Sequence, residues 1–205
     1  MEIYSKRVTD LRIDYRIADA MDLASGTMTA TIDGFSEEAI EFCIHKDGSL
    51  ILEKRVTVNS EGLVQVDFEI ENPELWYPHG YGAQALYNFS ASVGPLSRDP
   101  LSITHRVGVK KTELLQRLDD IGKSFYFKVN EQEVFCGGSN WIPADSFTPR
   151  ISPDRYRKWL QMMVDGNQTM IRYVDISGSS SVLRTLGYGV GAYTRKTYFT
   201  TSATS

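Results

Sequence analysis

The side chains best suited to bind a ligand lie in one short segment, residues 139–151. They are Asn140, Trp141, Asp145, Phe147 and Arg150. An indole beside a carboxylate suits sugar binding, because the ring stacks on the apolar face of a pyranose while the carboxylate accepts hydrogen bonds from hydroxyl groups. The residue types allow a second interpretation equally well, in which Trp141 is a packing residue that fills the mouth of a barrel.

The elements around this segment should form a strand, helix, strand unit. Residues 134–138 are short, apolar and end in two glycines, which is typical of a strand buried on both faces. A hairpin over 124–136 precedes this strand, with Phe125, Phe127 and Val129 on one face. Residues 169–172 should form the second strand. A parallel pair with a right-handed crossover follows, and loops after such strands carry the chemistry.

The helix between the two strands has clear start and stop signals. Ser152 is a good N-cap, Pro153 suits the first helical position, and Gly166 should end the helix in a left-handed conformation. Four apolar residues at helical spacing predict one buried stripe. They are Tyr156, Trp159, Leu160 and Met163.

Two stretches carry a resemblance to a known family. One is the run GKSFYFKVN, then VFCGGSNWIPADSFTPRIS, then RYRKWLQMMVDGNQTMIR, and the other is ENPELWYPHGYGAQALY at residues 71–87. Residues 1–172 resemble an internal fragment of the β-mannosidases of glycoside hydrolase family 2, of the intracellular B type. The resemblance implies an immunoglobulin-like sandwich followed by the start of a TIM barrel.

The resemblance also implies an activity, the exo-hydrolysis of terminal non-reducing β-D-mannose from oligosaccharides and glycans. The family uses a retaining mechanism with two glutamates, one after barrel strand 4 and one after strand 7. The substrate-binding candidates are Asn140, Trp141, Asp145 and Arg172, and the family's arginine at Arg172 would lie beside the nucleophile. No glutamate follows Glu133 and only 74 residues run from Gln132 to the end, so we expect no catalytic residue in this chain and no activity.

Residues 1–110 should form the sandwich, giving a fold class of mainly β plus α/β. Period-two alternation predicts seven short strands with turns between them, one of them at Asp47-Gly48. The buried side chains should include Ile13, Ile32, Phe42, Val66, Phe68 and Phe89. The aromatic cluster Trp76, Tyr77, Pro78, His79 and Tyr81 is either a sugar-binding platform or, as we favour, a packing surface against the neighbouring domain.

The remaining boundaries follow from composition. Residues 111–123 should be a polar linker, 124–172 the start of a TIM-barrel glycosidase domain, and 173–205 a divergent, disordered tail. Twelve of the 33 tail residues are Ser or Thr, and Tyr173 stands where the family places a tryptophan.

Bulk properties exclude several classes of partner. A net charge of −4 gives no electrostatic attraction to nucleic acid or an anionic membrane. The three histidines are scattered and the two cysteines lie in different apolar strands, so we expect no metal, no disulfide and no cofactor. The N-terminus lacks the apolar run of a signal peptide, which favours a cytoplasmic or other intracellular location.

Three hypotheses from different classes follow. The first is a β-mannosidase fragment whose partner in the complete enzyme is a carbohydrate. The second is a non-catalytic sugar-binding or docking module built on the sandwich. The third is a truncated product without a function of its own.

Overall fold

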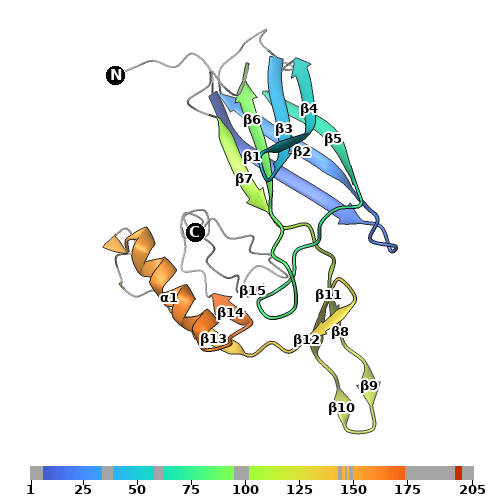
Figure 1. The fold of residues 1–205 in the computed structure, drawn as a ribbon, viewed down its shortest axis with the longest axis vertical. Coiled ribbons are helices and arrows are strands. Elements are labelled where there is room, and N and C mark those ends of the chain that lie inside the picture. The colour runs from blue at the N-terminus through green and yellow to red at the C-terminus, as the bar shows by residue number, and fades with distance from the viewer. Residues whose placement is uncertain are drawn as a thin grey trace. The chain divides into compact units, whose positions relative to one another are not determined.

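A computed structural model describes residues 7–33, 39–57, 62–94, 102–142, 145, 147, 150–173 and 197–199. The chain divides into two compact units by its internal contacts. The first comprises residues 1–73 and 86–107, and the second comprises residues 74–85 and 108–205. Figure 1 shows the elements of both units.

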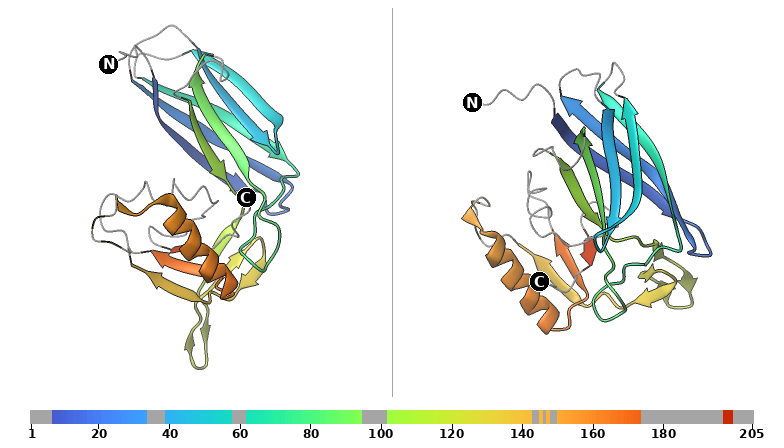
Figure 2. Two further views of the ribbon diagram at one scale, coloured as in Figure 1. Left: turned by 60° about the vertical axis from the view of Figure 1, so that its left-hand side comes forward. Right: turned by 45° about the horizontal axis from the view of Figure 1, so that its top comes forward.

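The first unit is a β-sandwich of two antiparallel sheets (Figures 1 and 2). One sheet has the strand order β1-β2-β5, with bounds Arg7–Ile17, Leu23–Asp33 and Leu63–Glu71. The other has the order β4-β3-β6-β7, with bounds Ser49–Thr57, Ala39–Lys46, Tyr87–Val93 and Ile103–Val107. The prediction of a β-sandwich is confirmed.

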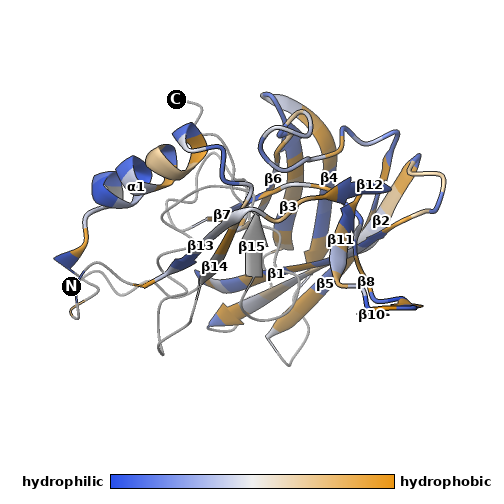
Figure 3. Cartoon of the chain, turned by 90° about the horizontal axis from the view of Figure 1, so that it is seen from below, coloured by the Kyte–Doolittle hydropathy of each residue, from blue (hydrophilic) through white to orange (hydrophobic). Residues whose placement is uncertain are grey.

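Alternation along the strands builds the core between the two sheets, and Figure 3 shows the hydrophobic and hydrophilic residues along them. β5 is the clearest case, since every second residue from Val64 to Ile70 is buried. Phe68 and Phe89 meet edge to face with their ring centroids 5.2 Å apart, a favoured aromatic geometry. Of the six residues predicted to be buried, Ile13 is the exception. It is only partly buried, whereas Val8 and Leu11 on the same strand are buried.

The predicted turn at Asp47-Gly48 joins β3 to β4. Both residues have positive φ angles, 48° and 82°, and Lys46 pairs with Ser49 across the turn. A two-residue loop with two left-handed residues matches the twist of an antiparallel hairpin. The prediction of a turn here is confirmed.

The second unit contains shorter sheets and one helix. Its antiparallel part has the order β12-β11-β8, with bounds Gln132–Val134, Tyr126–Val129 and Thr112–Leu115, together with the hairpin of β9 (Leu118–Asp119) and β10 (Gly122–Lys123). The other sheet has the order β13-β14-β15, with bounds Gly138–Trp141, Met170–Tyr173 and Thr197–Phe199. The helix α1 spans Pro153–Asp165.

The segment 74–85 interrupts the sandwich in sequence but packs inside the second unit. Trp76 is fully buried, its backbone N–H donates to the carbonyl of Val109, and its backbone carbonyl accepts from Asn130 Nδ2. Gly108 lies flush against the indole, since a Cβ there would come within 2.6 Å of the ring. Trp76 therefore packs, as we favoured, and offers no face for a sugar.

Three expectations differ from the structure in this unit. Residues 111–123, expected to be a linker, contain β8, β9 and β10. The strand expected over 134–138 is instead two strands: β12 ends the hairpin at Val134, and β13 begins at Gly138. Phe135, between them, is 82% exposed. The pair of glycines thus marks the start of the parallel strand rather than its end.

The tail shows one described strand, β15, which pairs antiparallel with β14. The rest of the stretch for which we expected disorder, residues 174–196 and 200–205, lies outside the described residues.

Candidate functional site

The candidate site is built on the parallel pair β13 and β14. Their register joins Gly138 to Met170 and Asn140 to Arg172, so the predicted parallel pairing is confirmed. The two strands come close at their first residues, because a Cβ on Gly138 would lie 1.7 Å from the carbonyl oxygen of Met170. Only glycine fits at that contact.

Thr169, which directly precedes β14, holds the start of that strand next to the start of β13. Its hydroxyl donates to the carbonyl of Phe135 at 2.6 Å, and its backbone N–H donates to the carbonyl of Gly137 at 2.8 Å. These bonds satisfy backbone groups at the point where the chain leaves the hairpin and enters β13. The register of the pair is therefore held by contacts as well as by the space at Gly138.

The two ends of helix α1 are set by Ser152 at its start and by Gly166 and Asn167 at its end. Ser152 caps it, as predicted, by accepting a hydrogen bond from the backbone N–H of Arg155. The predicted left-handed conformation of Gly166 is wrong. Gly166 has a φ of −84°, and the next residue, Asn167, takes the positive φ of 53°. Asparagine tolerates this conformation better than most residues, which moves the end of the helix by one position.

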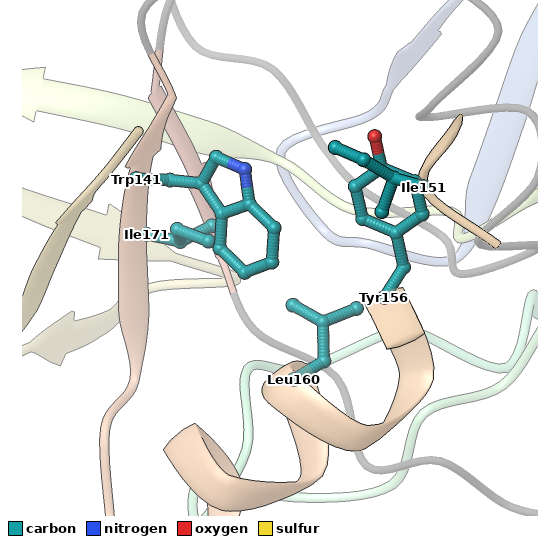
Figure 4. Packing of buried hydrophobic residues seen from close by; sticks show 5 residues of the cluster. All are labelled: Trp141, Ile151, Tyr156, Leu160 and Ile171. Atoms are coloured by element: carbon teal, nitrogen blue, oxygen red, sulfur yellow. The ribbon is translucent and has the colours of Figure 1, made fainter. Parts of the chain in front are cut away.

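The apolar stripe of α1 packs against β13 and β14, as Figure 4 shows for part of the cluster. Tyr156 and Leu160 are buried as predicted, whereas Trp159 and Met163 are only partly buried at the border of the cluster. Val164, which the sequence analysis did not include, is also buried. It lies four residues after Leu160, so the same spacing could have identified it.

Trp141 belongs to this hydrophobic cluster. Its side chain is 7% exposed, stacks on Tyr156 with ring centroids 6.0 Å apart, and meets Trp159 edge to face at 5.3 Å. The indole Nε1 is buried without a hydrogen-bond partner among the described residues. Of the two interpretations of Trp141, packing describes this indole: its ring lies against Tyr156 and Leu160 of α1 and Ile171 of β14, as Figure 4 shows.

Asn140 lies on the other side of β13 from Trp141, because neighbouring residues of a strand face opposite sides. Its side chain is exposed, and its register partner on β14 is Arg172. The structure therefore brings together two of the four predicted substrate-binding residues, at adjacent positions near the carboxyl ends of two parallel strands. Ligands of such sheets bind beyond these ends.

Asp145 lies in the loop between β13 and α1. Its Oδ1 accepts a hydrogen bond from the backbone N–H of Phe147 at 2.8 Å, which is a turn-stabilising contact. The guanidinium of Arg150 lies 4.8 Å from the centre of the Phe147 ring, within the range of a cation–π contact. The loop thus has internal contacts of its own, and one oxygen of Asp145 takes part in them.

An open groove of about 390 Å³ runs between β13 and α1. Its lining combines polar residues with partly exposed apolar ones: Ser139, Asn140, Trp141, Ile142, Trp159, Met162, Met163 and Gln168. Met162 and Ile142 are 62% and 75% exposed. The sequence alone does not predict this groove, because its walls depend on which side of the helix faces outward.

Two carboxylates of the described second unit, Asp154 and Glu131, are engaged in ion pairs. Asp154 pairs with Arg157 at 2.6 Å, and Glu131 pairs with Lys111 and Lys128. The hydrogen bond from Lys128, and then that from Lys111, lower the pKa of Glu131. A carboxyl group whose pKa is lowered holds no proton near neutral pH, so Glu131 is unsuited to act as a general acid.

Two further features bear on the class of site. Within the described ranges, no group of three or more His, Cys, Asp or Glu side chains could hold a metal ion. The described helix α1 falls short of the length and apolarity that a membrane crossing requires.

The sequence matches a family model over half its length. Residues 6–110 match the model described as glycosyl hydrolases family 2. The chain belongs to this family. Its sandwich is therefore a family 2 domain, and the prediction of a family 2 relationship is confirmed.

Similar proteins extend the relationship beyond the sandwich. β-Mannosidase B of Aspergillus niger is 41% identical over 175 residues, and that of Aspergillus clavatus is 38% identical over 174. Each match covers 84% of this family 2 chain, which spans 21% of the length of either relative. The predicted resemblance to β-mannosidases of the B type is thereby confirmed.

Solved structures agree with the assignment. A β-D-mannosidase from Dictyoglomus thermophilum superposes with a TM-score of 0.67 at 30% identity, covering 82% of this chain and 21% of that one. A β-glucuronidase from Parabacteroides merdae has a TM-score of 0.72 at 14% identity, covering 90% and 23%. The second likeness concerns the fold alone.

Proposed function

We propose that this chain forms part of a β-mannosidase that removes terminal, non-reducing β-D-mannose from oligosaccharides with retention of configuration. The observation that carries the proposal is the parallel pair β13 and β14 joined by α1. Strand, helix, strand is the repeating unit of a TIM barrel, whose active site lies at the carboxyl ends of its strands. In this proposal an immunoglobulin-like sandwich precedes the first unit of the barrel.

Asn140, Asp145 and Arg172 contact the sugar in this proposal. Asn140 and Arg172 are register partners at the carboxyl ends of the strands, and an amide and a guanidinium both donate hydrogen bonds to hydroxyl oxygens. Asp145 keeps one oxygen for its own loop and has a second oxygen that accepts from a sugar hydroxyl. Trp141 acts as a positioning residue, because its indole fixes β13 against α1.

In this proposal the two catalytic carboxyl groups come from outside these 205 residues. A retaining glycosidase holds two carboxyl groups about 5 Å apart on opposite sides of the scissile bond. The engagement of Asp154 with Arg157, and of Glu131 with two lysines, supports the proposal that neither serves as acid/base or nucleophile. We expect the 205-residue chain alone to leave an aryl β-mannoside unhydrolysed, and turnover that co-purifies with the chain would contradict this.

A hybrid enzyme tests the proposed substrate. Residues 1–172 would replace the matching segment of the Aspergillus niger β-mannosidase B, and the hybrid would be assayed on aryl β-mannoside and aryl β-glucoside. We expect hydrolysis of the mannoside in preference to the glucoside. A folded hybrid that prefers the glucoside would contradict the proposal.

Substitutions in the hybrid test the assigned roles. Asn140→Ala and Arg172→Ala should each lower kcat/KM by about tenfold or more, the effect of losing one or more hydrogen bonds to the substrate. Lys158→Ala, at an exposed position of α1, is the matched control and should leave kcat/KM unchanged. Unchanged kinetics in both test variants would remove β13 and β14 from the sugar site.

A further inference from the structure

A pocket of about 520 Å³ lies in the sandwich, and all of its lining residues belong to the first unit. Four strands contribute to it, namely β1, β2, β5 and β4 (Figure 1). The volume lies within the range of small-molecule sites, about 300–1,000 Å³. The polar residues of the lining are Arg16, Ser25, Thr27, Lys54, Asp67 and Glu69. A lining of this kind suits a polar ligand.

The floor of the pocket follows from the sizes of side chains on three neighbouring strands. In register, Arg16 of β1 lies opposite Ser25 of β2, and Ser25 lies opposite Glu69 of β5. Glu69 is exposed next to the buried Phe68, so this row lies on the outer face of the sheet. Neighbouring strands are about 4.8 Å apart, which places the backbones of Arg16 and Glu69 about 10 Å apart. The short Ser25 side chain therefore lies between two long ones.

One side of the pocket is held by hydrogen bonds around Asp67. The hydroxyl of Thr27 donates to Asp67 Oδ1 at 2.8 Å, and Lys54 Nζ donates to the backbone carbonyl of Asp67 at 2.7 Å. Lys54 belongs to β4 of the other sheet, so its side chain spans from one sheet to the other. Asp67 keeps its second carboxylate oxygen as an acceptor, and Lys54 keeps two of its three donors.

Arg16 and Glu69 carry opposite charges, yet neither forms an ion pair with a residue in the described part of the chain. Charged residues on an outer face commonly serve solubility alone. Here, however, the guanidinium and the carboxylate line one pocket together with a second base and a second acid, Lys54 and Asp67. The four charges sum to zero, and the set contains donors as well as acceptors.

We propose that this pocket binds a saccharide through its hydroxyl groups, as a site separate from β13 and β14. A sugar hydroxyl donates to a carboxylate and accepts from a guanidinium, so neighbouring hydroxyls satisfy Glu69 and Arg16 together. Leu52, a partly buried lining residue, offers contact to the apolar face of a pyranose. An anion would meet Asp67 and Glu69, and a cation would meet Arg16 and Lys54, so like charges disfavour both kinds of ion.

A residue-resolved NMR titration of the isotope-labelled full chain tests the proposal. Mannobiose would be added at millimolar concentrations, with sodium phosphate as a separate titration. We expect mannobiose to shift the amide resonances of residues 25–27 and 67–69, with a Kd on the order of 1 mM, since few hydrogen bonds act in an open pocket. Sodium phosphate should leave these resonances unchanged.

Two variants assign the binding to the opposed charges. Arg16→Gln and Glu69→Gln should each raise the Kd by about tenfold, the effect of losing hydrogen bonds to a charged group. Arg12→Gln and Glu71→Gln are the matched controls, because they make the same changes of charge at exposed positions of β1 and β5 outside the pocket. Both controls should bind as the wild-type chain does. The dispersion of the amide resonances reports whether each variant is folded.

Several results would overturn the proposal. They are the absence of shifts at residues 25–27 and 67–69, equal affinity in the wild-type chain and both pocket variants, and shifts caused by phosphate but not by mannobiose. Shifts confined to residues 138–141 and 170–173 would also overturn it, while supporting the proposed function. Conversely, shifts at the pocket together with a folded hybrid enzyme that prefers the glucoside would contradict the proposed function alone.

Discussion

The sandwich and the second unit use apolar residues differently. In the sandwich, side chains such as Phe42 and Phe89 are fully buried between two sheets. The described part of the second unit has a small cluster around Trp141, while Phe135, Ile142 and Met162 are well exposed. The difference shows that periodic alternation completes a core within about a hundred residues, whereas a strand, helix, strand unit buries only one side of its sheet.

The largest effect should come from the sandwich core. Phe42→Ala removes a fully buried ring and should lower the free energy of unfolding of the sandwich by about 3–5 kcal/mol. Phe135→Ala, at an exposed position of the second unit, should change it by less than about 0.5 kcal/mol. Urea denaturation measures both. Equal losses would show that the two regions do not differ as described.

A smaller but more local effect is expected at Gly138. Gly138→Ala places a methyl group against the carbonyl of Met170 and should destabilise the second unit by about 1–3 kcal/mol, the range of overpacked sites. Gly137→Ala is the matched control, because its Cβ would meet only the side chain of Phe135. Urea denaturation followed by the fluorescence of Trp141 would measure the free energy of unfolding of the second unit. A tolerated Gly138→Ala would contradict the close approach of the two strands.

The N-cap of helix α1 should contribute less to the free energy of unfolding than Gly138 does. Ser152→Ala removes the hydrogen bond that the hydroxyl accepts from Arg155 N–H, which should cost about 1 kcal/mol. Ser152→Asp, which keeps an acceptor at the cap, should restore most of the loss. Urea denaturation followed by the fluorescence of Trp159 would measure both. A serine-to-alanine change without effect would mean that α1 does not depend on its cap.

The two regions should respond oppositely to alkaline pH. Burial lowers the pKa of Lys110, in the second unit, to about 7. The unfolded chain holds that proton up to about pH 10.4, so the stability of the second unit should rise as pH increases above 7. Burial, with Glu41 and Glu53, raises the pKa of Cys43 in the sandwich to about 11. The folded sandwich then holds a proton that the unfolded chain releases, so its stability should fall above pH 9.

Denaturation of the two regions at pH 7, 8 and 10 would measure this contrast. Lys110→Met, which removes the amine that lies 3.9 Å from the centre of the Trp76 ring, should abolish the rise. Cys43→Ala should abolish the fall. A rise that persists in Lys110→Met would assign the pH dependence to another group.

The fold was predictable where local patterns and burial agree. The alternation of β5 placed Val66 and Phe68 in the core, and Ser152 with Pro153 located the start of α1. The fold was not predictable where one sequence pattern fits two structures. The glycines at 137 and 138 suit the start or the end of a strand, and only the contact between Gly138 and Met170 O distinguishes the two.

The candidate site was predictable only in part: the sequence indicates its residues but not which side of the strand each side chain faces. Asn140 and Trp141, predicted to lie in one loop, both belong to β13, and neighbouring positions of a strand face opposite sides. The side of the strand that meets α1 depends on packing against Tyr156 and Leu160. No local signal in the sequence reports that packing, so the burial of the Trp141 indole required the structure.

Hydrogen exchange is the most direct test of the difference between the two regions. Amide exchange would be measured by mass spectrometry in the 205-residue chain and in the hybrid with the Aspergillus niger enzyme. We predict that peptides from β13, α1 and β14 exchange at least about tenfold more slowly in the hybrid, because in the proposed function the rest of a barrel covers their open sides. Peptides from β3 and β6 should exchange equally in both proteins. Equal protection of residues 138–173 in the chain and the hybrid would contradict the assignment of this unit to the start of a larger catalytic domain.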